Sequence, residues 1–131
     1  MANGTIAFDT LQTSGQITGT AKSVDTDYVV SGSAKAWLHI PSGAASTISI
    51  SDSLNVTSIA DGGTGIYTPS YTNNMLNATY QASLASQRGA NYPDHPTIDN
   101  LTTSTMQMAQ TNASAYVDSA IYTASIHGDL A

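Results

Sequence analysis

The sequence predicts an all-β protein, an antiparallel β-sandwich or jelly-roll-like domain with an extended N-terminal arm, and three observations carry this prediction. The charged helix formers are nearly missing, because the chain has no glutamate and only three cations, Lys22, Lys35 and Arg88. Thr, Ser, Asn, Asp and Gly, which suit strands and turns, dominate the sequence. Turn signals separate the apolar segments at intervals of roughly 8–12 residues, as in sandwiches and jelly rolls.

The composition changes near residue 33. Residues 1–33 carry isolated apolar side chains among Thr, Ser, Gly and Gln, so we expect an extended attachment arm that contact with partners orders. Ile6 and Phe8 alternate as in a short strand, and 28–30 is a second candidate strand. The alternative is that this region supplies ordinary first strands of the sandwich. In either case residues 34–131 are expected to form the β-sandwich domain.

A clear period-two pattern begins at Ala34 and ends at Ile40. The even-numbered residues of this segment are all apolar and point one way, whereas Trp37 lies on the opposite face. A tryptophan on the second face implies that this face is also covered, at least in part. Pro41 and Gly43 end the predicted strand.

A hairpin is predicted further along the chain. Asp52 shares the parity of the apolar residues around it, which predicts a bend or bulge at this position. The glycine-rich segment 61–65 is a turn signal, and the strands 55–60 and 66–72 should pair across it. Pro69 predicts that the second of these strands lies at an edge or is bulged.

The remaining third of the chain predicts three strands and one long loop. Residues 79–85 alternate as a strand, and 86–101, with two prolines, are expected to form a loop. Residues 102–110 form a strand with its two methionines inward. The last strand, 115–126, is apolar on both faces, which indicates a central strand or a subunit interface.

Large apolar side chains are scarce, since the chain has one Phe, one Trp and four Met. A monomer would have few side chains from which to build a core, which favours an oligomer that shares apolar surface between subunits. The candidate subunit-interface residues are the apolar side chains of the tryptophan-bearing face and of the last strand, namely Trp37, Tyr116, Ile121, Tyr122 and Ile126.

Several function classes are disfavoured by the sequence. The net charge is −6 and no cations cluster, which excludes a nucleic-acid interface. No apolar run approaches about 18 residues, so no membrane insertion is expected. Cysteine is absent, the histidines lack metal-ligand spacing, and no nucleophile motif occurs. We therefore expect a protein that is not an enzyme and has no catalytic residues, cofactor or metal.

The tyrosines are the best candidates for binding at the surface. Tyr67, Tyr71 and Tyr92 lie in or beside the predicted loops, and His95 lies in the loop with two prolines. Tyrosine offers an apolar ring and a hydroxyl, so it suits glycan recognition. These four residues are the predicted surface-binding set, and packing or subunit contact is the alternative reading of the tyrosines.

Three stretches carry a family resemblance. The first is the opening 9–15; the second runs from Ala34 to Tyr71 and holds the segments Ala-Lys-Ala-Trp, Asp-Ser-Leu-Asn-Val and Gly-Thr-Gly-Ile-Tyr; the third is the ending 122–129. In this order and spacing they resemble small fibre-type virion proteins of tailed bacteriophages, especially of phages that infect aquatic bacteria such as cyanobacteria. The chain departs from the pattern at His39 and in its own Pro-rich loop, 91–96.

The resemblance implies a homotrimeric protein of the virion. Its N-terminal part, with Ile6, Phe8 and Leu11 as candidate attachment residues, would contact other virion proteins of the tail or capsid, and its β-domain would face outward. The leading interpretation is a fibre or fibre tip that contacts the host surface, with cell-surface glycan as the expected partner. The alternative is a trimeric capsid cement or decoration protein that stabilises neighbouring capsomers.

Overall fold

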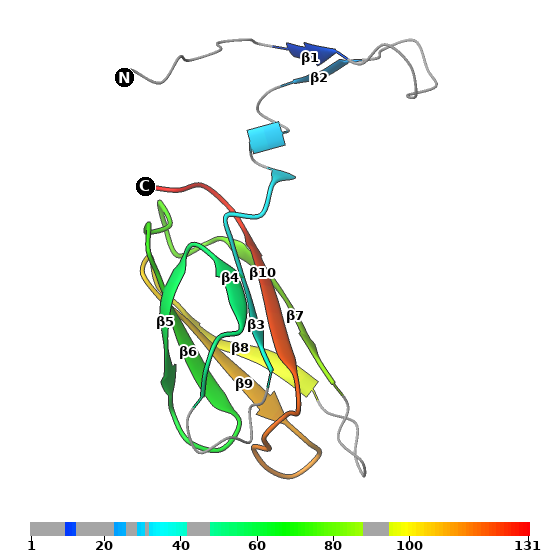
Figure 1. The fold of residues 1–131 in the computed structure, drawn as a ribbon, viewed down its shortest axis with the longest axis vertical. Helices are drawn as coiled ribbons and strands as arrows, with labels where there is room; N and C mark the ends of the chain where they lie inside the picture. The colour runs from blue at the N-terminus through cyan, green and yellow to red at the C-terminus, as the bar shows by residue number, and fades with distance from the viewer. Residues whose placement is uncertain (1–9, 13–22, 26–28, 31, 42–47, 88–94) are drawn as a thin grey trace. The chain divides into compact units, whose positions relative to one another are not determined.

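The computed structural model describes residues 10–12, 23–25, 29–30, 32–41, 48–87 and 95–131. The chain divides into two compact units, Met1–Ser33 and Ala34–Ala131. The second unit consists of two antiparallel sheets of four strands each (Figure 1).

The first unit contains a short two-stranded sheet. Strand β1, Thr10–Gln12, pairs antiparallel with β2, Ser23–Asp25, and Leu11 lies opposite Val24. The strand expected at 28–30 is wrong, because Val29 and the residue after it are helical and the Ser33 N–H donates to the Val29 carbonyl at 3.1 Å.

The second unit is a β-sandwich, as the sequence predicts. One sheet has the strand order β4-β3-β10-β7, and the other has the order β5-β6-β9-β8. Their bounds are β3 Ala36–Ile40, β4 Asp52–Leu54, β5 Val56–Asp61, β6 Ile66–Tyr71, β7 Gln81–Ser86, β8 His95–Leu101, β9 Met106–Thr111 and β10 Tyr122–His127.

The strand order differs from the jelly roll that the sequence also suggested. The consecutive strands β3 and β4, β5 and β6, and β8 and β9 are antiparallel neighbours within one sheet. In a jelly roll most consecutive strands cross to the opposite sheet. The last strand, β10, lies between β3 and β7, so the C-terminal segment completes the sheet that the domain's first strand began.

Between β4 and β5 the chain crosses from one sheet to the other, and a single residue makes this crossing. Asn55 separates β4 from β5 and has a φ of 56°, in the left-handed region that Asn tolerates better than most residues. Its side chain fixes the crossing, since Asn55 Nδ2 donates to the Asn73 carbonyl at 3.0 Å and Asn55 Oδ1 accepts from the Asn73 N–H at 2.7 Å. The bend expected at Asp52 therefore lies three residues later.

Strand β3 confirms the alternation expected from the sequence. Ala36, Leu38 and Ile40 are buried between the sheets, whereas Trp37 and His39 are half-buried on the outer face. The strand ends at Ile40, where the sequence places its stop signal.

Pro69 lies in a central strand, which corrects the expectation of an edge position. The β5–β6 pair does contain a bulge or irregularity, between Val56 and Ser58 of β5, next to the residue that pairs with Pro69. Strand β6 pairs with β5 along most of its length and with β9 at Ile66 and Tyr67. The pairing with β9 stops beside Pro69 and resumes in the same register at Ser70. Because proline lacks an N–H, the sheet accommodates it by a local gap in one ladder.

Strand β8 falls within the segment that the sequence predicts as a loop. Strand β8 lies at the edge of its sheet, where Pro96 is tolerated because one side of the strand has no neighbour that needs a backbone N–H. Most residues of β8 are exposed. An exposed edge strand lacks the apolar alternation by which strands are recognised. The expected loop is therefore wrong for 95–101.

The last strand is shorter than predicted. It begins at Tyr122, and residues 112–121 form turns that pack on the glycine turn before β6. The Gly65 N–H donates to Asp118 Oδ1 at 2.7 Å, and the Gly65 carbonyl accepts from the Gln110 N–H at 2.7 Å. Gly65 has a φ of 67°, and a Cβ there would lie 2.6 Å from the carbonyl oxygen of Val117.

The core lies between the two sheets and relies on tyrosine and methionine. Met106 and Met108 point inward from β9, as predicted, and both are fully buried. Among the described residues the buried core cluster comprises Ala36, Leu38, Ile40, Tyr67, Tyr71, Met75, Tyr80, Met106, Met108, Tyr122, Ala124 and Ile126.

Replacing Gly65 by alanine should destabilise the domain strongly. Gly65→Ala adds both a left-handed alanine and a steric clash with backbone atoms, so we expect a loss of about 3–5 kcal/mol in urea unfolding. Gly63→Ala is the control, because Gly63 also has a positive φ of 103° but no atom lies within 4 Å of the added Cβ. Equal losses for the two variants would contradict the packing of 112–121 on this turn.

The domain should lose stability at alkaline pH. Burial raises the pKa of Tyr67, Tyr71, Tyr80 and Tyr122 above the ordinary value. The unfolded chain then releases these protons near pH 10 while the folded chain holds them, so stability is full below pH 10 and falls above it. For Tyr71 and Tyr122, whose pKa burial raises most, we expect a loss of about 1 kcal/mol each near pH 11. Tyr71→Phe should reduce this loss of stability with pH. A urea midpoint of the native chain that stays constant between about pH 9 and 11 would contradict the prediction.

Candidate functional site

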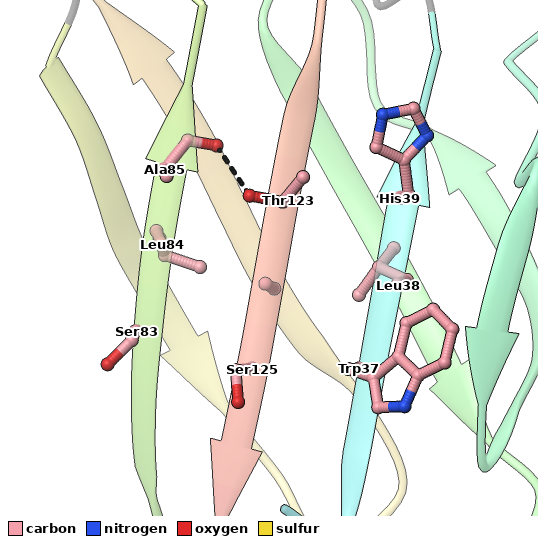
Figure 2. A pocket seen from close by; sticks show the side chains of 9 residues that line it. Trp37, Leu38, His39, Ser83, Leu84, Ala85, Thr123 and Ser125 are labelled. Carbon is pink, nitrogen blue, oxygen red and sulfur yellow. Dashed lines mark hydrogen bonds between the residues drawn. The ribbon is translucent and has the colours of Figure 1, made fainter.

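A shallow depression of about 360 Å³ lies on the outer face of the sheet β4-β3-β10-β7. We call it the outer groove. Figure 2 shows Trp37 and His39 on β3 along one side, Thr123 and Ser125 on β10 in the middle, and β7 on the other side. The described residues that line it are Trp37, Leu38, His39, Ser83, Leu84, Ala85, Thr123, Ala124 and Ser125.

Strand alternation and register bring these residues together. Side chains of directly paired residues lie on the same face, so the pairing produces two parallel rows across the sheet. The first row runs Leu54, Trp37, Ser125, Ser83. The second row runs Asp52, His39, Thr123, Ala85.

Residue size explains the depression. Trp37 is the largest side chain of the two rows, and its neighbours toward β7 are only serine, threonine and alanine. A large ring beside short side chains leaves a hollow along β10. Leu38, Leu84 and Ala124, which alternate with the outer residues, also border it.

The polar groups of the outer groove are partly engaged with the protein. His39 Nδ1 lies 2.6 Å from Ser51 Oγ, which fixes the ring. Thr123 Oγ1 donates to the Ala85 carbonyl at 3.3 Å, as Figure 2 shows, and Ser83 Oγ accepts from Gln81 Nε2 at 2.9 Å. Each hydroxyl therefore keeps part of its hydrogen-bonding capacity for a ligand.

Two ring nitrogens in the outer groove form no hydrogen bond within the part of the chain that the structure describes. These are Trp37 Nε1 and His39 Nε2. None of the described lining side chains is a carboxylate, an ammonium or a guanidinium. The arrangement offers an aromatic plane, carbon surface and neutral hydrogen-bonding groups, which is a binding chemistry.

Tyr67 and Tyr71, two of the predicted surface-binding residues, belong to the core, so that prediction is wrong for them. Tyr67 is 0% exposed and its ring centroid lies 5.4 Å from that of Tyr122. Tyr71 is 5% exposed, and its hydroxyl donates to Tyr80 Oη at 3.1 Å. A chain with few large aliphatic side chains fills its core with tyrosine, provided that the hydroxyls find partners.

Two of the predicted interface residues are also core residues. Tyr122 and Ile126 are each 0% exposed within one chain, and Tyr122 Oη donates to the Ala109 carbonyl at 3.0 Å. Their apolar surface therefore faces the opposite sheet and not a partner subunit. Strand β10 is central, which is one of the two readings that the sequence left open.

The remaining candidates fall in several places. Trp37 lines the outer groove, Tyr116 is 48% exposed in the turns before β10, and Ile121 is half-buried next to Tyr122. His95 is exposed at the start of β8, opposite Thr111.

Some predicted residues cannot be placed at the site. Leu11 lies in β1 of the first unit, whereas Tyr92, Ile6 and Phe8 lie outside the described residues. Of the described members of the predicted surface-binding set, Tyr67 and Tyr71 lie in the core and His95 lies exposed at the start of β8, so these three do not form one surface site.

The small polar members of the outer groove, Ser83, Thr123 and Ser125, are not recognisable from the sequence. Each is an ordinary outward residue of an alternating strand in a chain rich in Ser and Thr. Only the pairing of β10 with both β3 and β7 places them beside Trp37, and this long-range register is not written in any one segment. The tryptophan on the face opposite the apolar residues of its strand was the one local signal.

The described residues contain no group of three or more His, Cys, Asp or Glu side chains that could hold a metal ion. In the same part of the chain no helix is long and apolar enough to cross a membrane. Comparisons with protein-family models, with curated proteins and with solved structures find no match to this chain. The functional argument therefore depends on the residues and the geometry of this chain.

The two aromatic environments should differ in mutational cost. Tyr67→Ala leaves a cavity in the core and should lower the free energy of unfolding by about 3–5 kcal/mol. Trp37→Ala removes a half-buried ring from the outer face and should lower it by about 1 kcal/mol. Urea unfolding followed by circular dichroism measures both. A Trp37→Ala cost as large as that of Tyr67→Ala would mean that the indole is a structural element of the sheet and not a free binding surface.

Proposed function

We propose that this protein is a non-enzymatic structural protein of a tailed-bacteriophage virion, a trimeric short fibre or fibre tip that contacts the host surface. The observation that carries the proposal is the order and spacing of the segments between Ala34 and Tyr71, which resemble those of small phage fibre-type proteins. A fold alone does not imply a function. The resemblance suggests the role in the virion, and the outer groove must supply the contact with the host.

The same segments occupy the positions on which the sandwich depends. They comprise β3 with Trp37, the crossing at Asn55 and the turn that contains Gly65. A resemblance that falls on such positions supports a shared fold. The outer groove on β3 then supplies a surface suited to binding without catalysis.

The division of the chain is compatible with two tasks. Met1–Ser33 and Ala34–Ala131 are separate compact units, so one part could attach to tail or capsid proteins while the other contacts the host. For the trimer, exposed apolar side chains outside the outer groove offer contact surface. Apart from Leu54 beside the groove, the most exposed large apolar side chains among the described residues of the sandwich unit are Leu76, Tyr116 and Leu130.

A capsid cement protein is the second candidate. A trimer with a separate attachment unit would also fit the clamping of capsomers. Cement proteins occur at many more copies per particle than fibre proteins, so copy number separates the two.

The proposal is tested on particles of the phage whose genome encodes this chain. Quantitative mass spectrometry and immunogold labelling of purified particles should find the protein at low copy number on the tail. Labelling over the whole capsid at high copy number would indicate cement, and absence from the particles would refute a virion role. Light scattering of the purified protein should give three times the chain mass of 13.5 kDa, and a stable monomer would refute the trimer.

A further inference from the structure

We propose that the outer groove binds a short neutral glycan, with one sugar ring stacked on the indole of Trp37. The inference deepens the proposed function, since it assigns the host contact to one site and one ligand class. It stands on the geometry of the groove, which would bind sugar whether or not the protein is carried on a virion. Its failure can therefore be told apart from the failure of the virion role.

The first argument is size and shape. Ligand pockets usually occupy about 300–1,000 Å³, and the outer groove, at about 360 Å³, is at the small end of this range. It is open along one side of Trp37, because Thr123 and Ser125 on β10 are short (Figure 2). An open, shallow site of this size suits one or two units of a longer chain that continues beyond the groove.

The second argument is the mixture of carbon surface and neutral polar groups. A sugar ring has an apolar face of C–H groups and an edge of hydroxyls, so it fits an aromatic plane bordered by hydrogen-bonding groups. Ser83 accepts from Gln81 and keeps its own O–H to donate, whereas Thr123 donates to Ala85 and keeps its oxygen to accept. Trp37 Nε1 adds a donor at the rim.

The third argument is charge, which selects neutral sugars over acidic ones. A carboxylate, sulfate or phosphate would need a cation, and the described lining residues include no lysine or arginine. The chain's net charge of −6 further opposes an anionic ligand.

The same residues argue against a second copy of the chain as the occupant. A specific interface buries about 800 Å² per partner around a core of apolar and aromatic residues. The two rows across this face contain only Trp37 and Leu54 as large apolar side chains, and the other six members are polar or small. A glycan matches this mixture better than a protein surface does.

The test uses the single tryptophan of the chain as its own reporter. Because Trp37 is the only tryptophan, its fluorescence reports on the groove directly. The full chain is titrated with glucose, galactose, mannose and N-acetylglucosamine and with short oligomers of each. We expect a saturable change in emission with at least one neutral sugar, with a Kd on the order of millimolar for a single ring.

Two variants and one control locate the binding. Trp37→Ala should weaken binding at least tenfold, measured by calorimetry because the fluorophore is lost. Ser83→Phe, at an exposed position on the edge strand β7, fills the groove without touching the core and should also weaken binding tenfold. Tyr116→Ala removes an exposed aromatic ring outside the groove and should leave binding unchanged.

The outcomes separate the glycan from other occupants. No saturable response to any of these sugars, or binding that both groove variants retain, would overturn the proposal. If Trp37→Ala instead reduces the mass seen by light scattering, the groove is a contact between copies and the proposal is also overturned. Preference for an acidic sugar such as sialic acid would refute the neutral class.

Discussion

The composition forces tyrosine into the core, and much of the remaining structure depends on this. With its one phenylalanine in the first unit, the sandwich has few large side chains to bury, so its tyrosines must fill the space between the sheets. A buried tyrosine is tolerated only if its hydroxyl is bonded. Tyr71 donates to Tyr80, which donates to the Thr105 carbonyl, and Tyr122 donates to the Ala109 carbonyl.

This use of tyrosine determines what remains for the surface. Four of the seven tyrosines are buried in the core, so the large aromatic rings left accessible in the described sandwich are Trp37 on the outer sheet face and Tyr116 before β10. The short side chains of β10 give that surface its hollow. The same strand has two faces with two tasks, since Tyr122 and Ile126 hold the sheets together while Thr123 and Ser125 form the middle of the outer groove.

Local patterns predicted part of this fold, and long-range pairing supplied the rest. The alternation of β3, the hairpin across 61–65 and the inward methionines follow from period and turn chemistry, and all are confirmed. Strand β8 was missed because an exposed edge strand has no apolar alternation. Tyr67 was misassigned because a tyrosine near a turn suits a surface as well as a core. The candidate site could not be predicted, since it needs β10 between β3 and β7.

Four tyrosines are committed to the core, whereas Trp37 on the outer sheet face keeps part of its ring exposed to solvent. Hydroxyl-radical footprinting of the full chain, read by mass spectrometry, measures this difference, because one experiment compares all these rings. We expect rapid oxidation of Trp37 and protection of Tyr67, Tyr71, Tyr80 and Tyr122 until the domain unfolds. Protection of Trp37 together with rapid modification of Tyr67 and Tyr71 would contradict it.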